Sequence, residues 1–280
     1  MNKKIASYEP LIIEAGLAER NYWVDIWKYR ELFFVLAWRD IVVRYKQTFI
    51  GLAWAIIQPL STMLVFVVIF GRMAKFPSDG NIPYAILVFV GLLPWQLFST
   101  ALIGASGSLI GNANLINKVY FPRLIVPAAA VVVALVDFLI NFIILVVLMV
   151  WYQILPGWQI LTLPLFVVMA LLATLGPGLL ITALNVKFRD FRYIIPFIVQ
   201  FGLYVSPVGF SSSVVPDSWR LIYSINPVVS VIDGFRWAIL GGQAQLYMPG
   251  FLLGWCVILF FLFLGLRQFR KMERSFADLI

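Results

Sequence analysis

The 280-residue chain contains no histidine, so histidine metal sites and histidine general bases are excluded. Its one cysteine, Cys256, lies in an apolar run, and no intramolecular disulfide can form. Charged residues make up 12%, about half the share of a typical soluble domain. No glycine is followed by lysine, so the phosphate-binding loop G-x-x-x-x-G-K-[ST] is absent. The chain therefore has no nucleotide-binding loop of the usual kind.

Apolar residues are abundant instead. They make up 62% of the chain, and the mean hydropathy is +0.95. This composition predicts an all-α polytopic membrane protein. A net charge of +8 is compatible with nucleic-acid binding, but the basic residues lie in short segments between apolar runs. That distribution orients a membrane protein, so no nucleic-acid partner is expected.

The N-terminal region divides into two segments. Residues 1–26 are polar and mixed in charge, which is typical of a cytoplasmic tail. Residues 27–47 have an aromatic stripe at helical spacing and basic residues on the opposite face, which predicts an amphipathic helix in the headgroup region. A soluble helix packed on a partner is the alternative. The stripe comprises Trp27, Phe34, Trp38, Ile41 and Tyr45, and the basic face comprises Lys28, Arg39 and Lys46.

A transmembrane domain is expected over residues 48–268, because a helix of about 20 apolar residues crosses the hydrocarbon core. The fourth span contains Gly176-Pro177-Gly178, which we expect to interrupt it. After the polar turn SSSVVPDSW, residues 221–242 are apolar but contain Asn226-Pro227, Asp233 and Arg236, so we expect re-entrant helices over residues 206–242 and not a seventh span. The six predicted spans are residues 52–70, 84–103, 124–152, 160–184, 193–210 and 249–266.

The distribution of lysine and arginine predicts the orientation. With six spans, four of the 21 basic residues (Arg72, Lys75, Arg220 and Arg236) fall on the outer side, and the other 17 fall on the inner side. This asymmetry satisfies the positive-inside rule, whereas a seventh span would move the basic C-terminal segment outside. Both termini, including the tail over residues 269–280, are therefore expected in the cytoplasm.

Asp137 is the one ionisable residue well inside a predicted span. Ion-coupled transporters usually carry several, so we expect Asp137 to bond between helices or to contact another subunit, with proton relay as the alternative. The carboxylates predicted on the outer side, Asp79, Asp217 and Asp233, form no metal-ligand pattern. The sequence thus favours a transport protein over a membrane enzyme.

Three segments resemble one known family. RYKQTFIGLAWAIIQPL (residues 44–60), NANLINKVYFPRLIVP (112–127) and ALNVKFRDFR (183–192) are similar to the permeases of bacterial polysaccharide ABC exporters. That family moves lipid-linked O-antigens, capsular polysaccharides and teichoic acids across the inner membrane. The resemblance, from about residue 27 to the C-terminus, implies an inner-membrane homodimer with two copies of a separate ATPase, which would bind ATP and Mg. It implies no cofactor in this chain and a polysaccharide substrate linked to undecaprenyl diphosphate, with O-antigen favoured.

The resemblance also implies roles for particular residues. The interfacial segment would receive the substrate diphosphate through Arg39, Arg44, Tyr45 and Lys46, or it would only anchor the protein to anionic lipid. The loop after the second span would dock on the ATPase through Gly111, Asn114, Leu115, Lys118 and Tyr120. An outer gate would include Pro207, Asn226, Pro227, Asp233 and Arg236. Aromatic side chains such as Trp95 and Phe98 would line the sugar path.

Other functions stay open at this point. Within the family, the alternative to O-antigen is a capsular polysaccharide or a teichoic acid. A drug or lipid ABC permease shares the general fold, although the basic amphipathic helix argues against it. An ion-coupled secondary transporter has only Asp137 in its favour.

Overall fold

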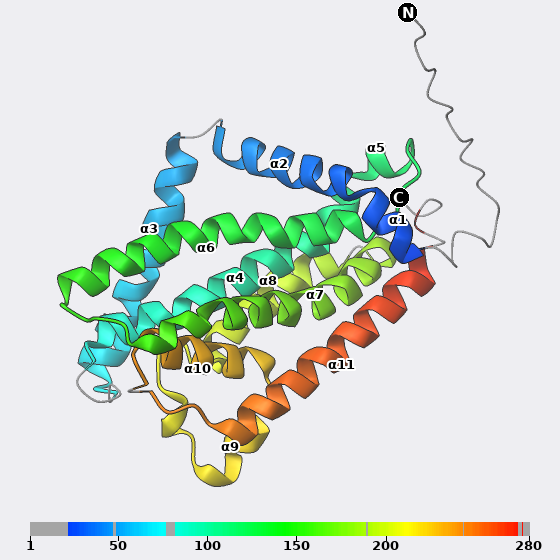
Figure 1. Cartoon of the computed structure of the whole chain (residues 1–280). Coiled ribbons are helices and arrows are strands. Elements are labelled where there is room, and N and C mark those ends of the chain that lie inside the picture. Colours follow the sequence, from blue (N-terminus) through cyan, green and yellow to red (C-terminus); the bar gives the residue numbers. More distant parts are fainter. Residues whose placement is uncertain are drawn as a thin grey trace, which may run out of the picture.

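The computed structural model describes residues 22–46, 49–76, 82–188, 190–242, 244–273 and 276, without the side chains at 46 and 49–52. Throughout these segments the regular elements are helices, as predicted (Figure 1). Among them, five helices are long and apolar enough to cross a membrane, and a shorter apolar helix joins them. The protein is a multi-pass membrane protein.

The N-terminal segment forms two helices in place of the single predicted one. Helix α1 covers Tyr22–Lys28, and α2 covers Arg30–Lys46. Helix α1 begins inside the segment that we expected to be a tail, because the Tyr22 ring is buried beneath the Arg270 guanidinium, 4.7 Å from the ring centre. The rest of the expected tail, residues 1–21, lies outside the described part.

Five of the predicted spans coincide with the five long helices. The first begins as an α-helix and ends as the π-helix η2, and the fourth begins with the 3-10 helix η3. Their bounds are α3 Phe49–Phe66 with η2 Val67–Met73, α4 Tyr84–Gly111, α6 Ile125–Trp151, η3 Trp158–Thr162 with α7 Leu163–Lys187, and α11 Met248–Glu273.

The predicted fifth span, residues 193–210, is shorter than expected. Helix α8 covers Phe191–Val205, which is 15 residues or roughly 22 Å. Ser206 is extended at φ −85° and ψ 153° because Pro207 follows it, and a residue before proline avoids the helical conformation. The hydrocarbon core is about 30 Å thick, so α8 alone does not match its thickness.

Residues 206–242 form three short helices, η4 Ser212–Val214, α9 Asp217–Tyr223 and α10 Pro227–Ile239. None of the three has the length of a span, in agreement with the sequence analysis. Helices α9 and α10 lie towards the end of the molecule opposite the C-terminal end of α11 (Figure 1). The inward side of α10 is buried among α4, α7 and α11.

Helix α4 forms the centre of the bundle. Over its most apolar 18 residues, 72% are buried, whereas the corresponding share for the first span is 11%. Helices α6 and α7 pack on α4, and α11 packs on α7. Helix α7 runs through Gly176-Pro177-Gly178 without a break, so the predicted interruption is wrong. A Cβ on Gly265 would lie 2.2 Å from the Gly176 carbonyl oxygen, and this backbone approach holds α7 against α11.

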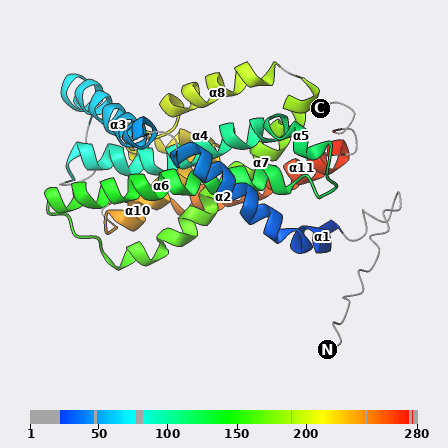
Figure 2. The ribbon, with the colours of Figure 1, turned by 90° about the horizontal axis from the view of Figure 1, so that it is seen from above.

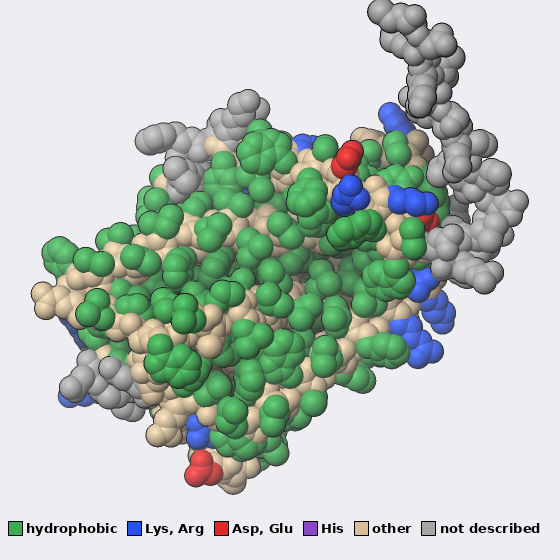
Figure 3. Space-filling model, viewed as in Figure 1, with side chains coloured by type: hydrophobic (Ala, Val, Ile, Leu, Met, Phe, Trp, Pro, Cys, Tyr) green, Lys and Arg blue, Asp and Glu red, His purple; other side chains and the backbone are tan. Residues whose placement is uncertain are grey.

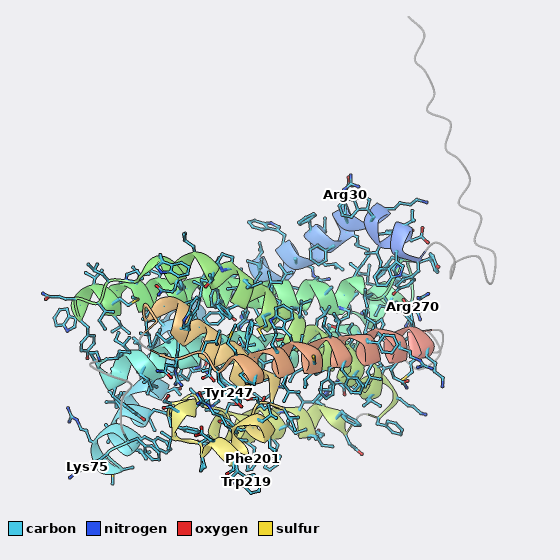
Figure 4. The ribbon with its side chains drawn as sticks, turned by 60° about the horizontal axis from the view of Figure 1, so that its bottom comes forward. Arg30, Lys75, Phe201, Trp219, Tyr247 and Arg270 are labelled. Carbon is cyan, nitrogen blue, oxygen red and sulfur yellow. The ribbon has the colours of Figure 1, made fainter. Side chains whose placement is uncertain are left out.

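The surface separates an apolar body from charged ends. Apolar side chains cover the face in Figure 3, and basic side chains gather at the end that holds α1 and the C-terminal end of α11. Figure 4 places Arg30 and Arg270 towards this end and Lys75 at the opposite end. The arrangement follows the charge asymmetry of the sequence.

Candidate functional site

The last turn of α2 reaches the side of α6. The Arg44 guanidinium lies 2.7 Å from an oxygen of Asp137, and the Tyr45 hydroxyl donates a hydrogen bond to the other oxygen. Asp137 is twelve residues into α6, about 18 Å from its start. The carboxylate thus bonds between helices, and its partners are two residues that the sequence assigned to substrate entry.

Exposure differs across this contact. The Asp137 side chain is 13% exposed, whereas that of Arg44 is 46% exposed. Burial, followed by the hydrogen bond to Asp137, raises the pKa of Tyr45 above its ordinary value, so the hydroxyl stays a donor. Lys46 ends α2, and its side chain lies outside the described part.

Arg39 connects α2 to the loop that follows α4. Its guanidinium donates to the Asn112 side-chain oxygen at 2.7 Å and to Asp40 at 2.6 Å. The Asn112 amide donates in turn to the Ser108 carbonyl at 2.9 Å, within the last turn of α4. Sequence reasoning missed Asn112, although it directly precedes α5, Ala113–Ile116.

The predicted coupling loop consists of α5 and the residues around it. Leu115 packs against a cluster that includes buried Ile116 and Phe121, so one side of the loop is fixed to the bundle. Four of the five predicted coupling residues, all except Leu115, are exposed: Gly111, Asn114, Lys118 and Tyr120. An exposed polar surface on a fixed base is suited to a soluble partner.

A clasp after this loop holds the C-terminal helix. The backbone N–H of Arg123 donates to the Glu273 carboxylate at 2.7 Å, and the Arg123 guanidinium donates to the Glu273 carbonyl. Neither residue was singled out from the sequence. The available signal was one acidic residue among the basic residues of RQFRKMER.

Of the two predicted channel aromatics, Trp95 is buried inside the bundle and Phe98 is partly buried against it. Trp95 is 5% exposed and lies 5.7 Å from the Phe98 ring centre. The indole lies against Gly202 of α8, where a Cβ would be 2.8 Å from its ring. A sugar path past Trp95 therefore requires α8 to move away from α4.

Arg236 is the centre of the predicted outer gate. Its side chain is among the largest fully buried ones, with 1% exposed. The guanidinium donates to the carbonyls of Phe210 at 2.8 Å and Val208 at 3.1 Å, in the turn after α8. A longer contact of 3.5 Å reaches the Leu87 carbonyl of α4. Arg236 thus joins α10, this turn and α4.

The other gate residues shape the same region. The Asn226 side chain caps α10 by accepting from the Val228 N–H at 3.1 Å, and it donates to the Ser206 hydroxyl at 3.1 Å. Pro227 is at the first helical position, which suits proline, and Pro207 lies in the turn that ends α8. Asp233 is one helical turn before Arg236. Burial raises the pKa of Tyr223; the charge of Asp233 raises it further, and the charge of Arg236 lowers it.

The long apolar helices define a polytopic membrane protein. The family model described as "ABC-2 type transporter" matches residues 31–240, three quarters of the chain. The chain therefore belongs to the ABC-2 type transporter family. It is a transport subunit and not an enzyme, and this family implies an ATPase partner.

Curated relatives are similar over most of their length. An "O-antigen export system permease protein RfbA" from Myxococcus xanthus is 31% identical over 215 residues, which cover 76% of this chain and 81% of that protein. A Klebsiella pneumoniae protein of the same name is 28% identical over 89% of this chain and 95% of its own length. The "Polysialic acid transport protein KpsM" from Escherichia coli is 25% identical over 85% and 92% respectively.

Proposed function

We propose that the chain is the permease of an ABC exporter that moves undecaprenyl-diphosphate-linked polysaccharide, O-antigen first, across the bacterial inner membrane. The proposal depends mainly on one observation: a half-exposed guanidinium, Arg44, lies on the interfacial helix beside the transmembrane bundle. The relatives named for O-antigen export, at 31% and 28% identity, support this substrate. An arginine fork in this position suits a phosphate group that arrives within the membrane plane.

Six crossings fit this function. Helix α8 would complete the sixth span together with the turn after Val205, and α9 and α10 would turn back at the outer side. Both termini would then lie in the cytoplasm with most of the basic residues. Irregular backbone at this depth is tolerable because α10 is enclosed by other helices.

We infer that two copies act together with two ATPase subunits. The outward side of α8 exposes Tyr193, Phe197, Phe201 and Tyr204, and few of the described side chains of α3 are buried; both helices lie at the edge of the bundle (Figure 2). A second copy or lipid would cover these apolar surfaces. The ATPase would dock on α5 and transmit its motion through α4 to α8 and Arg236, so that the aromatics around Trp95 become accessible between the two copies.

A capsular polysaccharide is the second candidate substrate. The KpsM relative and a Neisseria meningitidis relative named "Capsule polysaccharide export inner-membrane protein CtrC" support it. Export of teichoic acid is the same kind of transport, since each polymer is lipid-linked.

Two measurements test the proposal. Tagged protein would be recovered from native membranes in mild detergent, with an equimolar ATP-binding subunit and ATPase activity as the expected result. Depletion of the chain should trap lipid-linked glycan in the inner leaflet and remove polymer attached to lipid A. Loss of a surface polymer unconnected to lipid A would indicate capsule instead. Recovery of the chain alone, without ATPase activity, would contradict an ABC exporter.

A further inference from the structure

Two residues in the last turn of α2, Arg44 and Tyr45, contact an anion from within the protein, the Asp137 carboxylate. Tyr45 donates a hydrogen bond to one oxygen of the Asp137 carboxylate of α6, and the Arg44 guanidinium lies 2.7 Å from the other oxygen. This carboxylate is the single acidic group within α6. The α2 residues therefore already bind an anion, and the anion belongs to the neighbouring helix.

This ion pair can be exchanged for an external one. The Arg44 side chain is 46% exposed, so its guanidinium can be reached from outside the bundle while it contacts Asp137. A phosphate offers more acceptor oxygens and more charge than a carboxylate, and an arginine guanidinium can bind it through two parallel hydrogen bonds. A diphosphate arriving at Arg44 would also repel the carboxylate of Asp137, so both anions cannot stay close together.

The same helix has a second attachment point. Arg39 is five residues before Arg44, about 7.5 Å along α2, and it bonds to Asn112. Asn112 directly precedes α5, the predicted coupling helix. One short segment of α2 thus connects the internal anion pair to the expected docking point of the ATPase.

We propose that the Arg44–Asp137 pair is a latch between α2 and α6 that the lipid-linked diphosphate opens. The diphosphate binds Arg44 and Tyr45 in place of Asp137, and α2 leaves α6. Arg39 transmits this movement to Asn112, so ATP hydrolysis depends on the presence of substrate. The inference rests on the proposed function. In it Asp137 competes with the diphosphate for Arg44, so removing its charge should favour substrate binding. A proton relay, or a role in positioning Arg44, predicts the reverse.

The test uses the complex with its ATPase in lipid nanodiscs, with undecaprenyl diphosphate and its glycan-bearing form as probes. Wild-type ATPase activity should rise with each probe. Asp137→Asn should raise the activity without probe and lower the half-stimulating concentration about three- to fivefold, because the competing charge is gone. Asp217→Asn is the matched control, since Asp217 is almost fully exposed and should leave both values unchanged.

A charge exchange separates the latch from a purely structural ion pair. Arg44→Asp combined with Asp137→Arg keeps the pair but makes the α2 side acidic. Activity without probe should stay low and neither probe should stimulate, while co-purification of the ATPase confirms assembly. Stimulation at the wild-type level in the exchanged variant would overturn the latch.

Two further results would also overturn it. The first is that Asp137→Asn matches the wild type in both values. The second is that Asp137→Asn weakens stimulation, which would identify Asp137 as a positioning residue for Arg44. In either case a wild-type response to the glycan-bearing probe leaves the proposed function intact. A wild type that responds to neither probe would contradict the proposed function together with the latch.

Discussion

Two arginines show how differently this molecule holds a positive charge. Arg236 is 1% exposed and is surrounded by backbone carbonyls from the turn after α8 and from α4. Arg44 is 46% exposed and lies against the Asp137 carboxylate at the edge of the bundle. Backbone carbonyls cannot leave without unfolding the turn, whereas a side-chain carboxylate can rotate away. Arg236 therefore fixes a structure, and Arg44 has an exchangeable partner.

The largest expected effect comes from removing the enclosed charge. Arg236→Ala leaves buried carbonyls without their donor, and we expect a loss of about 3 kcal/mol or more in stability. A thermal-shift measurement of the apparent Tm in detergent checks this expectation. Arg72→Ala, at an exposed outer arginine, should change stability by less than about 0.5 kcal/mol. Equal Tm values for both variants would show that Arg236 does not fix the structure.

The exchangeable charge should affect transport and not stability. Arg44→Gln with Lys46→Gln should reduce glycan export about tenfold or more, because charge-assisted contacts to the diphosphate are lost. The change in stability should stay within about 1 kcal/mol, since the Arg44 side chain is 46% exposed and Tyr45 still bonds to Asp137. Export is measured as surface polymer, after membrane insertion is confirmed. Full export in this variant would mean that the basic end only anchors α2 to lipid.

A smaller effect is expected where backbone closes around Arg236. A Cβ on Gly91 would lie 3.0 Å from the Arg236 guanidinium and 3.0 Å from the Val208 oxygen. Gly91→Ala should therefore cost about 1–3 kcal/mol through overpacking. Gly107→Ala is the control on the same helix, because nothing lies within 4 Å of its Cβ, and it should be neutral or slightly stabilising. Equal Tm values would show that the turn yields easily around Arg236.

The smallest effect concerns the second attachment point of α2. Asn112→Ala removes the acceptor for Arg39 and should reduce substrate stimulation of the ATPase a few-fold, in line with one hydrogen bond. Asn112→Asp keeps an oxygen acceptor and should preserve stimulation. Binding of the lipid probe is measured in parallel and should be unchanged in both. Loss of stimulation in the aspartate variant too would point to a direct role of Asn112 at the ATPase.

The fold could largely be predicted because the bilayer imposes simple rules. Apolar length placed the five long helices, and the charge balance excluded a span through residues 206–242. The early end of α8 was also readable in principle from Ser206-Pro207. Continuity through Pro177 was not, because it depends on how closely α7 packs on α11.

The contacts of the candidate site could not be predicted in the same way. Periodicity shows which α2 residues share a face, but it does not show that Tyr45 meets a residue 92 positions away. The aromatic content suggested Trp95 as a channel residue. Its burial follows from Gly202, whose missing side chain leaves room for the indole. The residue pattern along one helix does not show how its side chains fit against another helix, so these contacts could not be predicted.

The shortness of α8 has a consequence for the surrounding lipid. At roughly 22 Å it falls about 8 Å short of the hydrocarbon thickness, a case of hydrophobic mismatch. Beside α8 the bilayer must thin, or the buried turn that follows Val205 must complete the crossing. In the first case a hydrophilic polymer that passes this helix crosses a thinner dielectric barrier than it would meet elsewhere in the membrane.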